Sequence, residues 1–304
     1  METPKRVYNL ISDRQTEILN ENTNTQLKYE SFSVGSLPSK IDLRLKLPPI
    51  IDQGSVGSCT ACAISAAFQY CDPSWIPSEL FIYYNTRMLD NNVNTDSGTT
   101  ISQTVNSIVK YGACNKVNWP YNVNSWSTRP TKLCYTEALD HQALNYSHIQ
   151  QTYVSMKSCL ASGFPFVIGI FLWQSFESSS AALTGFIPIP DKTKEQYLGG
   201  HAVLCCGYDD DKKVWIMRNS WGPRWGDKGY FYVPYSYLED MSNVASDSWK
   251  ITLVETVKQT DIQNKIVPKI VKGRIIRPPI RWAKINSFGQ KEFVDIPLSY
   301  QFVV

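Results

Sequence analysis

A cysteine follows two closely spaced glycines in the segment Gln53-Gly-Ser-Val-Gly-Ser-Cys59. Gly54 and Gly57 allow a tight turn and a close approach of the backbone to a ligand. An Ala-rich helical pattern begins at Cys59, so free N–H groups and the helix dipole should lower the pKa of its thiol. Such a thiolate is a nucleophile, and the amide of Gln53 can donate to an oxyanion. An inert buried cysteine is the alternative interpretation.

A histidine and an asparagine form the second candidate group. Strand patterns over 201–208 and 214–219 flank an acidic turn at 209–211. A hairpin centred on this turn puts His201 opposite Asn219, with Cβ atoms about 4.5–5.5 Å apart. The Asn219 carbonyl would then hold the imidazole in one orientation, as the third member of a catalytic triad does. A slip of one residue in register would separate the two side chains, and a histidine of the core is the alternative.

The elements that position these residues change in type along the chain. Helical patterns begin at Cys59, at Ser78 and at Ile101, where the last one ends before Gly112. Strand patterns follow at 164–173, 201–208, 214–218 and 230–233. Helices first and strands second predict an α+β protein with a helical lobe and an antiparallel β-rich lobe.

Composition narrows the class of protein. The 304 residues are 43% hydrophobic and contain eight cysteines, which excludes wholesale disorder and a disulfide-stapled mini-protein. The longest apolar run, 164–173, has ten residues, whereas a membrane-spanning helix needs about 20. We therefore expect no membrane partner. The N-terminus shows no apolar region typical of a secretory signal, which favours a cytosolic or virus-associated protein.

Positive charge gathers in the C-terminal segment. Residues 256–304 hold nine basic and three acidic residues, while the rest of the chain is slightly acidic. This segment is predicted to be a basic extension, either a solvated tail or an arm for an acidic partner. Nucleic acid is not favoured as a partner because no RNA- or DNA-binding motif accompanies the charge.

Three separated motifs together resemble the papain-like, or cathepsin-like, cysteine peptidases. The histidine of that family lies roughly 130–150 residues after the cysteine, and here the separation is 142 residues. The likeness is greatest to the branch found in bacteria and large DNA viruses. The family resemblance rests on Gln53–Cys59, Gly200–Val203, Asn219–Gly222 and Trp225–Tyr230. The likeness to this branch rests on Pro38–Arg44, Asp52–Ala61, Asp96–Gly98 with Ile101, and Trp119–Tyr121.

The resemblance implies a thiol protease that cuts peptide or protein substrates without a cofactor or metal. It implies Cys59 as nucleophile, His201 as general base and acid, Asn219 as orienting residue and Gln53 as oxyanion donor. Trp221 would shield the Asn–His hydrogen bond, with Trp225 beside it. The implied substrate-binding residues are Gly98, Thr99, Gly200 and Trp221.

The chain departs from the family pattern at three places. Val56 stands where the family usually has a disulfide-bonded cysteine, and its partner before Gly98 is also missing. Thr60 replaces a tryptophan of the cleft wall. Gly98-Thr99 replaces a Gly-Gly pair whose backbone binds substrate. These changes affect the expected shape of the subsites more than the expected chemistry.

The predicted organisation has three parts: residues 1–36, residues 37–255 and the basic extension 256–304. The peptidase part divides into a helical lobe at about 52–145 and a β-rich lobe at about 146–255, with the cleft between them. Residues 1–36 are interpreted either as a short pro-segment of a zymogen or as a structural arm on the back of the β-rich lobe. The anchors expected of a pro-segment in the cleft are its larger apolar residues: Val7, Tyr8, Leu10, Ile11, Ile18, Leu19, Tyr29 and Phe32.

Two other functions remain open on the sequence alone. One is an inactive papain-like binding module. The other is a redox or zinc protein that uses the C-x-x-C motif of Cys59 and Cys62, with Cys205 and Cys206 near His201.

Overall fold

The computed structural model describes residues 6–12, 37–246 and 248–255, together with the backbone of four short C-terminal strands. These strands pair as β8 (Lys269–Val271) with β9 (Arg274–Ile276) and as β10 (Arg281–Ile285) with β11 (Lys291–Asp295). The predictions for residues 1–5 and 13–36, and for the side chains of the basic extension, lie outside the described residues.

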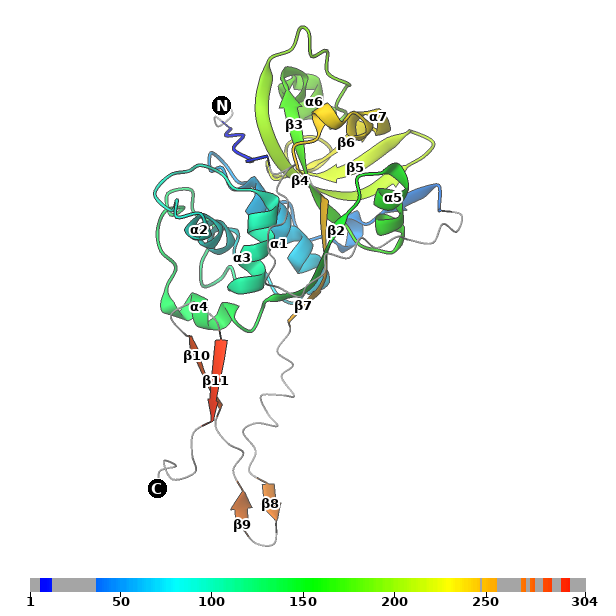
Figure 1. Ribbon diagram of the computed structural model, residues 1–304. Coiled ribbons are helices and arrows are strands. Elements are labelled where there is room, and N and C mark those ends of the chain that lie inside the picture. The colour runs from blue at the N-terminus through cyan, green and yellow to red at the C-terminus, as the bar shows by residue number, and fades with distance from the viewer. Residues whose placement is uncertain are drawn as a thin grey trace.

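Four helices form one side of the molecule (Figure 1). The helices are α1 (Cys59–Cys71), α2 (Glu79–Leu89), α3 (Ile101–Lys110) and α4 (Lys132–Ala138). Helix α1 is buried from Cys59 to Phe68, as its Ala-rich sequence predicts. The side chain of Ser78 accepts a hydrogen bond from the N–H of Phe81 and caps α2.

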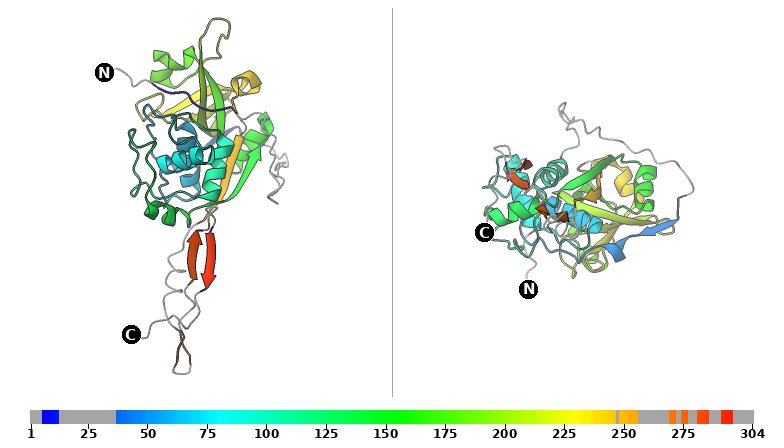
Figure 2. Two further views of the ribbon diagram at one scale, coloured as in Figure 1. Left: turned by 60° about the vertical axis from the view of Figure 1, so that its left-hand side comes forward. Right: turned by 90° about the horizontal axis from the view of Figure 1, so that it is seen from below.

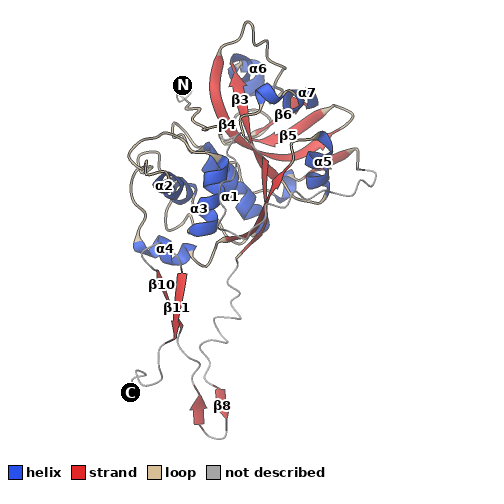
Figure 3. Ribbon diagram, in the orientation of Figure 1, coloured by secondary structure: helices blue, strands red, loops and turns tan. Residues whose placement is uncertain are grey.

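An antiparallel sheet forms the other side (Figure 3). Its strand order is β2–β7–β3–β4–β5–β6, and a short strand β1 also pairs with β4. The strands are β1 (Lys40–Asp42), β2 (Ala143–Ile149), β3 (Phe166–Trp173), β4 (Tyr197–Asp209), β5 (Val214–Arg218), β6 (Tyr230–Pro234) and β7 (Ser248–Val254). The short helices α5 (Tyr153–Ala161), α6 (Ser179–Thr184) and α7 (Tyr235–Glu239) lie within this half of the chain.

The alternation of side chains along the strands joins the two sides. Ala202 and Leu204 of β4 and Val167 of β3 belong to the core around α1, whereas Val203 and Ile168 belong to the core of the β-rich lobe. Helix α1 therefore packs against the sheet, and its first residue lies beside β4. The predicted α+β class is confirmed.

The N-terminal residues of the described structure lie against both sides of the molecule. Residues 6–12 run between the helical side and the sheet, visible as the dark blue stretch near the N-terminus in Figure 2. Among the described residues, no helix combines the length and the apolar character that crossing a membrane requires.

Candidate active site

Cys59 and Gln53 come from the helical wall of the site. Cys59 is the first residue of α1 and is fully buried. The backbone N–H groups of Ala202 and Thr60 lie close enough to its sulfur to favour the thiolate. The Gln53 side chain is held at both ends: Nε2 donates to the Val56 carbonyl at 2.9 Å, and Oε1 accepts the hydroxyl of Ser220. The amide is therefore fixed beside the start of α1.

His201 and Asn219 come from the β-rich wall. The Nε2 atom of His201, on β4, lies 2.8 Å from Oδ1 of Asn219, just after β5. Asn219 is held in turn by its N–H donating to the Gly229 carbonyl at 3.0 Å. Among the described residues, Nδ1 of His201 has no hydrogen-bond partner. The ring is thus oriented through one nitrogen while the other is free for proton transfer.

Trp221 covers this pair, as the sequence suggested. Its ring stacks on His201 with centroids 5.0 Å apart and packs edge-on against Trp225 at 4.9 Å. Phe176 supports both indoles. The aromatic cluster excludes water from the imidazole and fixes its plane.

The expected register of the hairpin is wrong, although the expected contact between His201 and Asn219 exists. Leu204 of β4 pairs with Arg218 of β5, and His201 pairs with Ile170 of β3. The chain turns at 210–213, where Asp209 pairs with Val214, so the centre of the hairpin lies beyond residue 210. A bulge between Cys205 and Gly207 shifts the pairing by only one residue. Asn219 reaches the imidazole because the chain leaves β5 after Arg218, not because the two residues face each other in the ladder.

Residues 6–12 occupy the space between the two walls. The Leu10 N–H donates to the Gly200 carbonyl at 3.1 Å, and the Ile11 N–H donates to the Thr99 carbonyl at 3.2 Å. Asn9 forms a parallel bridge with Gly200. The segment therefore binds backbone groups of both lobes at once.

Gly98 shows how close this approach is. Its φ of +72° is one that glycine adopts readily, and a Cβ there would lie 1.6 Å from the backbone oxygen of Asn9. Trp221, at the other end, contacts Tyr8 at 5.8 Å between ring centroids and lies under the guanidinium of Arg6. All four expected substrate-binding residues thus touch the N-terminal segment.

The segment buries one apolar side chain deeply. Leu10 is only 7% exposed and joins the core cluster that contains Cys59, Ala202 and Ala245, while the neighbouring Ile11 is 44% exposed. Leu10 is therefore the anchor of the segment in the cleft.

Burial changes the titration of the reactive groups. It raises the pKa of the Cys59 thiol to about 11, although the N–H groups of Ala202 and Thr60 act in the opposite direction. It lowers the pKa of His201 to about 4, although the hydrogen bond that the ring donates to Asn219 favours the charged form; the charge of Arg6 lowers the pKa further. The expectation of a lowered thiol pKa is wrong for this closed form, because desolvation outweighs the helix N-terminus.

The alternative chemistries find little support in the geometry. Within the part of the chain that the structure describes, no group of three His, Cys, Asp or Glu side chains is arranged to hold a metal ion. Cys62 is buried one turn along α1 and contacts the Ser58 hydroxyl at 3.7 Å. Burial raises its thiol pKa well above the ordinary value.

The sequence reasoning missed several residues around the site. Ser220 holds Gln53, and its place in the Asn-Ser-Trp-Gly motif was a usable signal. Glu177 accepts the hydroxyl of Tyr8, but nothing in its sequence context indicated a role. Asp96 accepts the N–H of Gly57 at 3.1 Å and so ties the loop before Gly98 to the start of α1.

Fold and site together define a class: a two-lobed α+β protein with a buried thiol at the start of α1, beside the strand that carries a buried imidazole. A model of papain family cysteine proteases matches residues 37–249. An uncharacterized peptidase C1-like protein of Acanthamoeba polyphaga mimivirus is 40% identical over 215 residues, which cover 66% of this chain and 68% of that protein.

Solved structures agree. Xylellain, a cysteine protease from Xylella fastidiosa, has a TM-score of 0.70 at 34% identity, over 85% of this chain and 99% of that one. A cysteine protease of Carica candamarcensis, solved with E-64, has a TM-score of 0.53 at 18% identity, over 71% of this chain and 99% of that one, and shares the fold. The chain belongs to the papain family of cysteine proteases, as the sequence resemblance implied.

Proposed function

We propose that this cysteine protease hydrolyses peptide bonds through Cys59, His201 and Asn219, with Gln53 as oxyanion donor. The observation that carries the proposal is the oriented imidazole next to the buried thiol. Nε2 of His201 is held by Asn219, and the residue after His201 donates its N–H to the Cys59 sulfur. This is the geometry of a nucleophile with a base and an orienting residue.

The reaction has two covalent steps. His201 takes the proton of Cys59, and the thiolate attacks the peptide carbonyl carbon. The N–H of Cys59 and the second Nε2 hydrogen of Gln53 stabilise the oxyanion. His201 then gives its proton to the leaving amine, and the C–N bond breaks to leave a thioester. Water that gives its proton to His201 attacks the thioester and releases the acid product and the free thiol.

The N-terminal segment is part of the same proposal. Residues 6–12 act as a pro-segment that keeps the protease closed, because a peptide substrate cannot reach Cys59 while they lie over it. Backbone bonds to Gly200 and Thr99 and the buried Leu10 support this role. The basic extension 256–304 is proposed as a separate element that leaves the reaction unchanged.

Replacement of the nucleophile tests the proposed function. Cys59→Ala in the full chain should abolish hydrolysis of a peptidyl coumarin amide, and the protein should stay folded because alanine suits the surroundings of α1. Cys62→Ala is the matched control, since it removes a buried thiol one turn away and should keep activity. Activity retained in Cys59→Ala, or lost equally in both variants, contradicts the mechanism.

Chemical labelling gives an independent test. Treatment with the epoxide E-64 followed by mass spectrometry should modify Cys59 selectively among the eight cysteines, and faster when Leu10 is replaced by asparagine. Uniform labelling of all the cysteines would favour an inactive binding module.

A further inference from the structure

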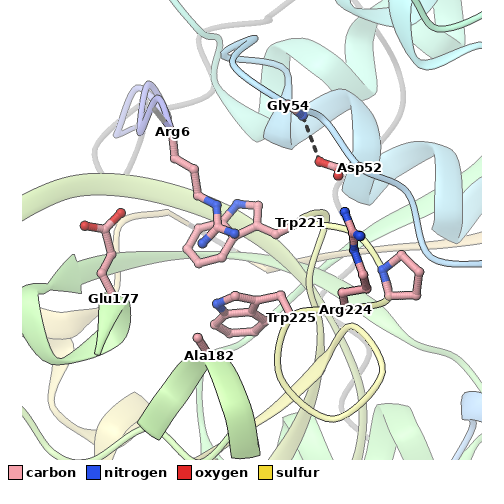
Figure 4. Close-up of a pocket in the computed structure, with 10 residues that line it drawn as sticks. Arg6, Asp52, Gly54, Glu177, Ala182, Trp221, Arg224 and Trp225 are labelled. Atoms are coloured by element: carbon pink, nitrogen blue, oxygen red, sulfur yellow. Dashed lines mark hydrogen bonds between the residues drawn. The ribbon is translucent and has the colours of Figure 1, made fainter. Parts of the chain in front are cut away.

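A pocket of about 440 Å³ opens beside Trp221, at the end of the cleft away from Leu10. Arg6 enters it, and its guanidinium carbon lies 4.1 Å from the centroid of the Trp221 ring. Figure 4 shows the guanidinium above the face of the indole, with Trp225 beneath it. This contact is a cation–π interaction on a ring that its aromatic neighbours hold in place.

The pocket also carries negative charge. Glu177, from the turn after β3, and Asp52, before Gln53, both line it. Burial lowers the pKa of Arg6, and the two carboxylates act against this effect. Figure 4 shows Glu177 on one side of Arg6 and Trp221, and Asp52 with Arg224 on the other side, so the carboxylate at the first end has no lining cation other than Arg6 beside it.

The position of the pocket relative to the reaction follows from His201. The imidazole gives its proton to the leaving amine, and its ring stacks on Trp221. The amine product therefore departs past Trp221, whereas Leu10 lies on the acyl side, against Ala202 and Ala245.

We infer that this pocket is a subsite for an arginine side chain of the substrate, on the leaving-group side of the bond that is cut. In the closed form the guanidinium of Arg6 lies on the Trp221 ring and lines one side of this pocket. A planar guanidinium suits an indole face flanked by carboxylates better than an ammonium does, so arginine is favoured over lysine. The inference rests on the proposed function, because it names the substrate preference of that same site.

The experiment uses the full chain with Leu10→Asn and Arg6→Ala, which loosen the segment and vacate the pocket. Quenched fluorescent peptides differ only in having arginine, lysine, alanine or glutamate at each leaving-group position. We expect kcat/KM to be about tenfold higher for arginine than for alanine at one position, with lysine between them and glutamate lowest. Equal rates for arginine, alanine and glutamate at every position overturn the inference.

Removal of one carboxylate tests whether the preference for arginine comes from this pocket. Glu177→Gln should reduce the arginine-to-alanine ratio at least threefold, because it removes a carboxylate of the pocket. Glu239→Gln, which removes an exposed carboxylate of the same lobe outside the pocket, should keep the ratio. A ratio that falls equally in both variants would show only an effect of net charge and would overturn the assignment.

Two further measurements separate this inference from the proposed function. A peptidyl coumarin amide has no residue on the leaving-group side, so its hydrolysis reports the chemistry alone. Isothermal titration of the same peptides into the Cys59→Ala, Leu10→Asn, Arg6→Ala chain reports the pocket alone. Tighter binding of the arginine peptide, at least fivefold over alanine, supports the subsite even when no peptide is cut; equal affinities overturn it.

Discussion

The two walls of the cleft are built in different ways. The helical wall takes Gln53 and Cys59 from one short stretch of chain, and the turn before α1 sets their relation. The β-rich wall takes His201 from β4, while Asn219 and Trp221 come from the loop after β5. Local sequence thus positions Cys59, whereas tertiary packing positions His201. Residues 6–12 contact both walls, so substitutions in this segment test the closed arrangement of the two walls together.

The largest expected effect comes from the helical wall. Gln53→Ala should lower kcat by about 10²–10³-fold, because in the proposed mechanism it removes an oxyanion donor that acts in the transition state. The measurement is steady-state kinetics on the peptidyl coumarin amide in the Leu10→Asn background. Ser220→Ala frees one end of Gln53 and should have a smaller effect. A Gln53→Ala enzyme as fast as its parent would assign a purely structural role to this residue.

Replacement of Asn219, on the β-rich wall, should lower activity less than replacement of Gln53 does. Asn219→Ala should leave measurable activity, lowered by up to about 10²-fold, because Cys59 and His201 remain and only the orientation of the ring loosens. Trp221 still covers one face of the imidazole. Kinetics in the same background check this. Complete loss, equal to that of Cys59→Ala, would instead make Asn219 indispensable to the fold or the chemistry.

Among substitutions in residues 6–12, replacement of the buried Leu10 should have the largest effect on activity. Leu10→Asn should raise the activity of the full chain by about 10–100-fold, because it places an amide in an apolar pocket and weakens the closed form. Ile11→Asn is the matched control, since Ile11 is 44% exposed. A chain that starts near Leu37 should also be faster, and the isolated segment should inhibit it. Similar rates in Leu10→Asn and the parent chain would favour a structural arm.

A fall in pH should also favour the open form, with a smaller effect on activity than Leu10→Asn. Burial lowers the pKa of His201 to about 4. We expect that release of the segment exposes the ring and returns its pKa to the ordinary value of 6.5, so that protons bind more tightly to the open form. The stability of the closed form is complete above pH 6.5 and is lost as the pH falls toward 4. Between pH 7 and pH 5.5 the ratio of open to closed protein should rise about eightfold.

The ratio of wild-type to Leu10→Asn activity at each pH measures this opening, because the titration of the catalytic groups cancels between the two proteins. Arg6→Ala should reduce the pH effect, since the charge of Arg6 disfavours the protonated ring. A ratio that does not change with pH would mean that His201 titrates alike in both forms.

Much of the fold was predictable because the informative patterns are local. The Ala-rich run from Cys59 and the capping residue Ser78 fix the starts of α1 and α2, and continuous apolar runs mark β3 and β5. The elements β2, β7 and the short helices α5 to α7 were not predicted. Their sequences mix polar and apolar residues, and the sheet itself stabilises them.

The sequence alone determined the reactive residue types, their order and the family. It also determined that Cys59 begins a buried helix, because helical periodicity and turn glycines act over a few residues. Tertiary structure decided the rest. The position of the turn after β4 changed the register by which His201 was expected to meet Asn219, and burial of Cys59 reversed the expected pKa shift of its thiol. Register, desolvation and the pocket of Arg6 depend on segments far apart in the chain, which no local pattern encodes.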